Sequence, residues 1–195
     1  VIGTHALVYK SIEFQNLAYV IIDEQHRFGK AHRQKLTRKG GVSPHLLSMT
    51  ATPIPRTLNL GLNKLRDIST ITTPPPGRLP VVTEVRKYNE SLIRDTIMYE
   101  VNRGGQVFFL HNKVQTIEGL TEKLRMIIPE ARFVVAHGQM ESDMLEDRIR
   151  EFKEKKYDVL VSSTIIENGI DLPNANTLIV NNADEFGLSQ LYQLR

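Results

Sequence analysis

Short runs of apolar residues alternate along the chain with longer segments in which apolar residues recur every three or four positions. The short runs are typical of buried strands, and the longer periodic segments are typical of helices. The predicted strands are residues 19–23, 46–50, 107–111, 132–136, 158–162 and 177–181. The predicted helices are residues 91–103, which end at Gly104-Gly105, residues 117–127, which precede Pro129, and residues 142–155. This alternation indicates an α/β fold with mostly parallel sheets flanked by helices, in which the strands are buried on both faces.

The strongest interruption of this pattern is the segment Thr73-Pro74-Pro75-Pro76-Gly77-Arg78-Leu79-Pro80. Each proline removes a backbone N–H donor and disfavours the helical conformation. We therefore expect a linker at residues 73–83 that separates an N-terminal part, residues 1–72, from a C-terminal part, residues 84–195. The N-terminal part supplies few strands for an independent α/β domain, so we expect it to be incomplete.

Composition narrows the class of protein. Hydrophobic residues make up 41% of the chain and charged residues 24%, values typical of a folded soluble protein. There is no cysteine, which excludes a disulfide framework and a thiolate metal site and suits a reducing, cytoplasmic compartment. No apolar run approaches the ~18 residues that a membrane-spanning helix needs, so we expect no membrane association.

Charge is distributed unevenly along the chain. The first 80 residues carry 11 basic and 4 acidic side chains, whereas the remaining residues carry 14 basic and 18 acidic ones. A basic part suits a polyanionic partner such as nucleic acid, because each neutralised phosphate releases counterions. A lopsided solvated surface explains the same distribution, so charge alone leaves both interpretations open.

The first candidate for chemistry is the carboxylate pair Asp23-Glu24, which directly follows the apolar run Tyr19 to Ile22. The carboxyl ends of parallel strands are where such sheets bind ligands. One carboxylate can hold Mg²⁺ with the phosphates of a nucleotide, while its neighbour orients or deprotonates an attacking water. Taken alone, the pair is explained as well by a solvated strand end.

A second candidate segment closes the next strand. In Ser48-Met49-Thr50-Ala51-Thr52-Pro53, two threonine hydroxyls flank a small residue where they can reach the carboxylates or His26. A threonine-rich turn before Pro53 is the simpler alternative. Together, however, Asp23-Glu24-Gln25-His26 and Thr50-Ala51-Thr52 resemble motif II (D-E-x-H) and motif III ([S/T]-A-T) of the superfamily two helicases and translocases.

The resemblance continues in family order along nearly the whole chain. The other matching segments are Gly3-Thr4-His5 (motif Ib), residues 107–112 (motif IV), residues 163–173 (motif V) and residues 190–195 (the opening of motif VI). Six matches in register form a far more specific signal than any one of them. The resemblance implies two RecA-like lobes, of which residues 1–72 are the C-terminal part of the first and residues 84–195 belong to the second.

Within the superfamily, the chain is similar to a group of bacterial DNA translocases that comprises the RecG and transcription-repair coupling families. The likeness lies in residues 26–29, 49–58, 137–140 and 186–190. It is closer to the transcription-repair coupling family, through residues 56–69 and the short path from Val107 to His137. Gln25 departs from the likeness to the coupling family, because that family commonly has glutamate at this position whereas RecG has glutamine.

This resemblance implies an ATP-dependent and Mg²⁺-dependent translocase on double-stranded DNA that displaces stalled RNA polymerase. RNA polymerase and repair proteins would bind to domains outside these residues. A RecG-like helicase that remodels replication forks is the alternative within the group. A non-catalytic nucleic-acid-binding module is the alternative of another class, and an affinity for DNA that falls steeply with salt would support it.

Carried over by position, the resemblance assigns roles to individual residues. Asp23 would hold Mg²⁺, Glu24 would activate water, and His26, Thr50 and Thr52 would couple the nucleotide state to the grip on DNA. Contacts to the DNA backbone, which bind phosphate without reading bases, would come from Thr4, His5, Arg56, His137, Gly138 and Thr164. The nucleotide-sensing residues of the cleft would be Gly169, Asp171 and Gln190.

Some of these residues have simpler explanations. His137 followed by Gly138 is also typical of a turn at a strand end. Gly169 can simply supply a positive φ angle, and Asp171 can cap a turn before Pro173.

Two family elements are missing from these 195 residues. There is no G-x-G-K-[S/T] loop, whose backbone N–H groups cradle phosphates, and no Gly-Arg-x-Gly-Arg segment, which supplies arginine fingers. We therefore expect the chain to be a piece of a longer motor protein and to be inactive as an ATPase by itself.

Overall fold

The computed structural model describes residues 1–4, 6–9, 14, 16–24, 28, 44–50, 67–73, 75–77, 80–163 and 172–194. The chain divides into two compact units, Val1–Leu79 and Pro80–Arg195. The division falls within residues 73–83, where the prolines predict a linker. Around it, the described residues from 67 to 89 form neither helix nor strand, and they are exposed. The assignment of the two units to two motor lobes stays a prediction.

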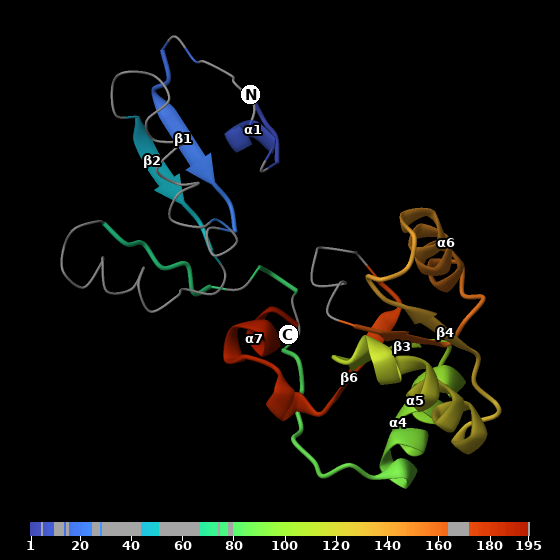
Figure 1. The fold of residues 1–195 in the computed structure, drawn as a ribbon. Helices are drawn as coiled ribbons and strands as arrows, with labels where there is room; N and C mark the ends of the chain where they lie inside the picture. Colours follow the sequence, from blue (N-terminus) through green and yellow to red (C-terminus); the bar gives the residue numbers. More distant parts are fainter. Residues whose placement is uncertain are drawn as a thin grey trace. The chain divides into compact units, whose positions relative to one another are not determined.

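The described part of the first unit contains one short helix and two strands (Figure 1). Helix α1 spans Ala6–Tyr9, strand β1 spans Tyr19–Ile22, and strand β2 spans His45–Ser48. The two strands pair in parallel, with Tyr19 opposite His45 and Ile22 opposite Ser48. Both strands were predicted, and the parallel pairing brings their carboxyl ends to the same edge.

The predicted burial of β1 on both faces is wrong. Val20 and Ile22 are buried, but Tyr19 and Ile21 are 71% and 64% exposed. Strand β2 alternates in the same way between exposed and half-buried positions. Successive side chains point to opposite faces of a strand, so one face of this sheet is the more buried in the described part of the unit and the other is exposed.

The second unit holds a parallel four-stranded sheet with the strand order β4-β5-β3-β6. All four strands and three helices of this unit match predicted elements, with ends that differ from the predicted ones by at most three residues. The strands are β3, Gln106–His111; β4, Phe133–Ala136; β5, Val159–Ser162; and β6, Ala175–Asn181. The helices are α4, Glu90–Asn102; α5, Val114–Ile127; and α6, Ser142–Lys153.

Helices cover both faces of this sheet, which explains the burial of its central strands. On one face, α4 and α5 contribute Ile97, Ile117 and Leu124 to a core with side chains of β3, β4 and β5. On the other face, Phe152 of α6 packs with residues of β4 and β5. Strands β4 and β5 are buried at every position. Strand β6 is not, and Leu178 is 38% exposed, so the prediction of burial on both faces is also wrong for this strand at the end of the order.

Helix α4 begins and ends as the sequence predicts. At its start, the Asn89 side chain accepts a hydrogen bond from the Leu92 N–H at 3.2 Å. At its end, Gly104 and Gly105 donate N–H groups to the carbonyls of Val101 and Glu100, each at 3.0 Å, which is the Schellman arrangement. Gly104 adopts a φ of 79°, a conformation that glycine takes without steric cost.

After β6 the chain makes a short 3₁₀ helix, η3, Ala183–Glu185, and then helix α7, Leu188–Leu194. Within the described residues, none of the helices is long and apolar enough to span a bilayer.

Candidate functional site

In the first unit, the carboxylates predicted for catalysis stand at the carboxyl end of β1. Asp23 and Glu24 follow Ile22 directly, and the Met49 N–H donates to the Ile22 carbonyl at 2.8 Å. This hydrogen bond extends the β1–β2 pairing beyond Ser48 and leads the chain to Thr50 at the same edge. The carboxylates of the predicted motif II and Thr50 of the predicted motif III therefore come from adjacent strand ends.

Glu24 has an unusual backbone. Its φ is 50°, in the left-handed region that costs a residue with a β-carbon about 1 to 2 kcal/mol. Its N–H donates to Asp23 Oδ1 at 2.8 Å. Strain of this kind is concentrated at functional sites, because the surrounding structure must hold it in place. The strained residue here is the one that the sequence assigns to water activation.

This edge also has the chemistry that a hard cation needs. Asp23 is exposed, and carboxylate oxygens are preferred ligands of Mg²⁺. At the end of the adjacent strand, the Ser48 hydroxyl is buried and has no hydrogen-bond partner among the described residues. The exposed carboxylate of Asp23 is a donor that fits the Mg²⁺-nucleotide site that the resemblance implies, although the described residues hold no group of three His, Cys, Asp or Glu side chains that could bind a metal ion.

In the second unit, polar residues end or follow all four strands at the carboxyl edge of the sheet. In the strand order they are His137 after β4, Ser163 after β5, His111 and Asn112 at the end of β3, and Asn181 at the end of β6. His137 Nδ1 is buried without a hydrogen-bond partner in the described part of the chain. Amide and imidazole groups contact phosphates without reading bases, so Asn112 and His137, the half-buried side chains that follow β3 and β4, are a candidate nucleic-acid interface.

His111 is the most constrained member of this row. It is 5% exposed, and Asn181, its partner in the parallel register, places Nδ2 3.0 Å from His111 Nδ1. His111 Nε2 lies 2.7 Å from Thr116 Oγ1 of α5. Burial lowers the pKa of His111 below its usual 6.5, since desolvation disfavours the imidazolium; nearby Glu185 raises the pKa and Lys113 lowers it to a smaller extent.

The turn after β6 is tied to the same corner of the structure. Lys113, which precedes α5, forms an ion pair with Glu185 at 2.5 Å. Beyond this turn, the Gly187 N–H donates to Gln190 Oε1 at 3.0 Å, which is half of a capping box at the start of α7. Gln190, predicted to sense nucleotide, thus orders the beginning of its own helix in this structure.

The structure brings some predicted site residues together and leaves others undescribed. Asp23, Glu24 and Thr50 share one edge of the first unit; Thr4 lies just before α1. His137 and Gly138 lie at the carboxyl edge of the second unit, where Gly138 is exposed. The predicted residues outside the described part of the chain are His5, His26, Thr52, Arg56, Thr164, Gly169 and Asp171. Sequence reasoning gave no individual role to His111, Ser163 or Asn181, although His111 and Ser163 lie in the segments that match motifs IV and V.

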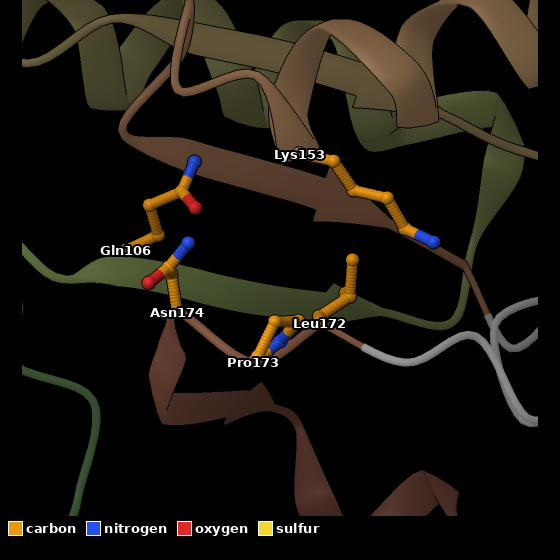
Figure 2. A pocket seen from close by; sticks show the side chains of 5 residues that line it. All are labelled: Gln106, Lys153, Leu172, Pro173 and Asn174. Atoms are coloured by element: carbon orange, nitrogen blue, oxygen red, sulfur yellow. The ribbon is translucent and has the colours of Figure 1, made fainter.

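A cavity of about 260 Å³ lies at the opposite, amino-terminal edge of the second sheet (Figure 2). Gln106 begins β3, Asn174 precedes β6, and Lys153 ends α6; Leu172 and Pro173 complete the lining. Gln106 Nε2 donates to the carbonyls of Phe152 and Tyr157, each at 2.7 Å. None of these residues belongs to the predicted site, so the cavity does not mark it.

The parallel sheet with helices on both faces and polar groups at its carboxyl edge has the organisation of a doubly wound α/β lobe. Residues 88–195 match the family model described as "Helicase conserved C-terminal domain", and the chain belongs to this family.

Similarity to curated relatives extends over the whole chain. The chain is 50% identical over 194 residues to the transcription-repair-coupling factor of Haemophilus influenzae. This match covers 100% of the chain and 17% of the relative. It is also 50% identical over 196 residues to the transcription-repair-coupling factor of Staphylococcus aureus strain USA300, with the same coverages. The chain thus spans about a sixth of the length of these relatives.

A solved structure supports the fold. RecG bound to a three-way DNA junction superposes with a TM-score of 0.70 and 37% identity, covering 99% of this chain and 26% of RecG. The predicted fold class and the predicted likeness to the RecG and transcription-repair coupling families are confirmed.

Proposed function

We propose that the protein containing this chain is an ATP-driven translocase on double-stranded DNA that displaces stalled RNA polymerase in transcription-coupled repair. The observation that carries the proposal is the 50% identity to transcription-repair-coupling factors over the whole chain. It exceeds the 37% identity to RecG. The protein moves along double-stranded DNA in the cytoplasm. It binds RNA polymerase and repair proteins through domains beyond these residues.

The described residues support specific roles in this activity. Bound ATP and Mg²⁺ supply the phosphoryl-transfer chemistry of such motors. Asp23 holds the ion through its exposed carboxylate, and Glu24, set in a strained backbone beside it, orients the attacking water. Thr50, at the end of the adjacent strand, couples this site to the DNA grip. His137 and Gly138 contact the DNA backbone at the carboxyl edge of the second sheet.

The roles proposed for the remaining predicted residues rest on sequence position alone. His26 and Thr52 join the coupling group, and Gly169, Asp171 and Gln190 line the nucleotide cleft. The other contacts to the DNA backbone come from Thr4, His5, Arg56 and Thr164. These 195 residues contain no phosphate-binding loop, so we propose that they do not hydrolyse ATP on their own.

The test uses the full-length protein and measures DNA-stimulated phosphate release. Glu24→Gln should lower kcat by about 10² to 10⁴, the range for loss of a general base. Glu118→Gln, which changes an exposed carboxylate on α5, is the matched control and should leave the rate unchanged. Wild-type turnover in the Glu24→Gln protein would refute the assignment.

The RecG-like alternative is favoured by the structural likeness to RecG. Two substrates separate the two functions: a stalled RNA polymerase on double-stranded DNA, and a branched fork without polymerase. ATP-dependent release of the polymerase supports the proposal. Efficient fork reversal without polymerase release would favour the alternative.

A further inference from the structure

We propose that His111 and Lys113 are positioning residues, which hold the turn between β6 and α7, and with it Gln190, against the corner formed by β3 and α5. The inference deepens the proposed function, on which it rests, because Gln190 is one of the residues assigned to the nucleotide cleft. Neither His111 nor Lys113 contacts nucleotide or DNA in this proposal. Their task is to fix where the start of α7 stands.

The first anchor holds the beginning of the turn. His111 and Asn181 end adjacent parallel strands as register partners, and their side chains meet at 3.0 Å. The other ring nitrogen meets Thr116 Oγ1 at 2.7 Å, and this hydroxyl lies 3.3 Å from the Lys113 carbonyl. The imidazole therefore joins the end of β6 to the first turn of α5.

The polarity of this network requires a neutral imidazole. With its amide nitrogen facing the ring, Asn181 donates to Nδ1, so Nε2 carries the proton and donates to Thr116 Oγ1. The Thr116 hydroxyl then donates to the Lys113 carbonyl. A neutral ring offers one donor and one acceptor, and the network uses both, whereas an imidazolium offers two donors. Burial of the ring, which lowers its pKa, favours the same neutral form.

The second anchor holds the end of the turn. Lys113 Nζ lies 2.5 Å from Glu185 Oε1, and Glu185 is the last residue of η3. The lysine side chain is 56% exposed and the glutamate 28%, so this ion pair is the weaker of the two anchors. Both anchors come from residues 111–116, and they hold the two ends of residues 181–185.

The held turn contains a residue with a left-handed backbone. Asn182 adopts a φ of 53°, in the left-handed region that asparagine tolerates better than most residues with a β-carbon. Phe186, which follows the turn, is 6% exposed and adds an apolar contact. The Gly187 N–H then caps on Gln190, so the position of Gln190 depends on where the turn delivers the start of α7.

The test compares variants of the full-length protein by hydrogen–deuterium exchange and by ATPase kinetics. His111→Phe keeps a planar ring and loses both hydrogen bonds. His111→Gln keeps one donor and one acceptor and should restore the network. Lys113→Ala removes the second anchor, and Lys123→Ala is its control, because it removes another ion pair of α5, with Glu90 at 2.5 Å.

His111→Phe should raise exchange at residues 182–190 about tenfold, the effect expected from two lost hydrogen bonds. Exchange at residues 107–110 should not change. The KM for ATP should rise several-fold while kcat changes less, and His111→Gln should return both readouts to near the wild-type values. Lys113→Ala should give the same pattern at smaller amplitude, and Lys123→Ala should give none of it.

Two results would overturn the inference. One is unchanged exchange at residues 182–190 in both His111→Phe and Lys113→Ala. The other is a uniform rise across the second unit, which would show a general loss of stability rather than a local release of the turn. If His111→Phe does not fold, Thr116→Val and Lys113→Ala carry the test. Failure of the proposed function would be measured separately, as the absence of DNA-stimulated ATP turnover in the wild-type protein. The hydrogen–deuterium exchange of the variants does not depend on that measurement.

Discussion

The carboxylate of Glu100 occupies the space that a side chain at position 105 would need. Glu100 is fully buried in the last turn of α4, and its Oε2 accepts hydrogen bonds from Arg103 Nη2 and Thr177 Oγ1, each at 2.7 Å. A β-carbon added at Gly105 would lie 1.8 Å from Glu100 Oε1. Gly105→Ala therefore forces the carboxylate to move, and this movement strains or breaks both hydrogen bonds.

The expected cost follows from these contacts. Overpacking a buried site costs about 1 to 3 kcal/mol, and weakened hydrogen bonds to a charged group add to it, so we expect a loss of about 2 to 4 kcal/mol. Gly105 does not have a positive φ, unlike Gly104. Alanine therefore suits its backbone, and in a Glu100→Ala background the same substitution should change the free energy of unfolding by less than about 1 kcal/mol. The difference predicts a coupling energy of about 2 to 3 kcal/mol.

The assay is urea unfolding followed by circular dichroism for the wild type, the two single variants and the double variant. Gly104→Ala is the control, since nothing lies within 4 Å of a β-carbon there and its φ is 79°. It should cost about 1 to 2 kcal/mol in both backgrounds, from backbone conformation alone. An equal cost of Gly105→Ala with and without the Glu100 carboxylate would refute the steric argument.

Two further predictions concern ionisable groups. Asp158 accepts hydrogen bonds from Arg132 N, Nε and Nη2 at 2.8 to 2.9 Å, so Asp158→Asn should cost about 1 to 2 kcal/mol in thermal unfolding at pH 7. Burial raises the pKa of Asp158, but the Arg132 hydrogen bonds outweigh this effect and hold the pKa below its usual 3.8. The stability difference between the wild type and Asp158→Asn should therefore be lost as the pH falls below about 4. An unchanged stability difference at pH 3 would contradict this prediction. Burial lowers the pKa of His111 in the folded protein, so as the pH falls the unfolded chain binds a proton at this histidine before the folded protein does. The wild type should therefore lose stability relative to His111→Gln as the pH falls below 6.5. A stability difference between the two proteins that stays constant from pH 8 to pH 5 would contradict the neutral ring.

The positions of the strands were predictable because each is a short apolar run that ends in polar residues. Val107 to Leu110 and Val159 to Val161, for example, are uninterrupted aliphatic and aromatic runs, and both became central strands. Their burial on both faces was also predictable, since continuous apolar runs are typical of parallel strands that are covered on both faces. The end of α4 was also predictable, because its periodic apolar segment is followed by two glycines.

The faces of β1 were not predictable from the same kind of run. Tyr19-Val20-Ile21-Ile22 reads as apolar at every position, yet Tyr19 and Ile21 are exposed. An apolar run carries no alternation from which a covered and an uncovered face can be told apart. The Glu100–Gly105 contact was hidden for a related reason. Glu100 lies in a predicted helix, where a charged residue is ordinarily on the solvated side, and only the packing of α4 beside Thr177 shows that it is buried.

The places of Asp23, Glu24 and His137 in the fold were predictable, because Asp23-Glu24 follows the end of β1 and His137 follows the end of β4, while their roles stay predictions. The pairing of His111 with Asn181 was also within reach of the sequence, although no motif assigned it. The predicted strands 107–111 and 177–181 have equal length, and each ends in a polar residue after an apolar run. If such strands are adjacent and parallel, their ends coincide at one edge of the sheet, and His111 and Asn181 must face each other. The missing information was the strand order, because the chain visits β4 and β5 between β3 and β6, and sequence proximity therefore gives no sign that the two polar ends meet.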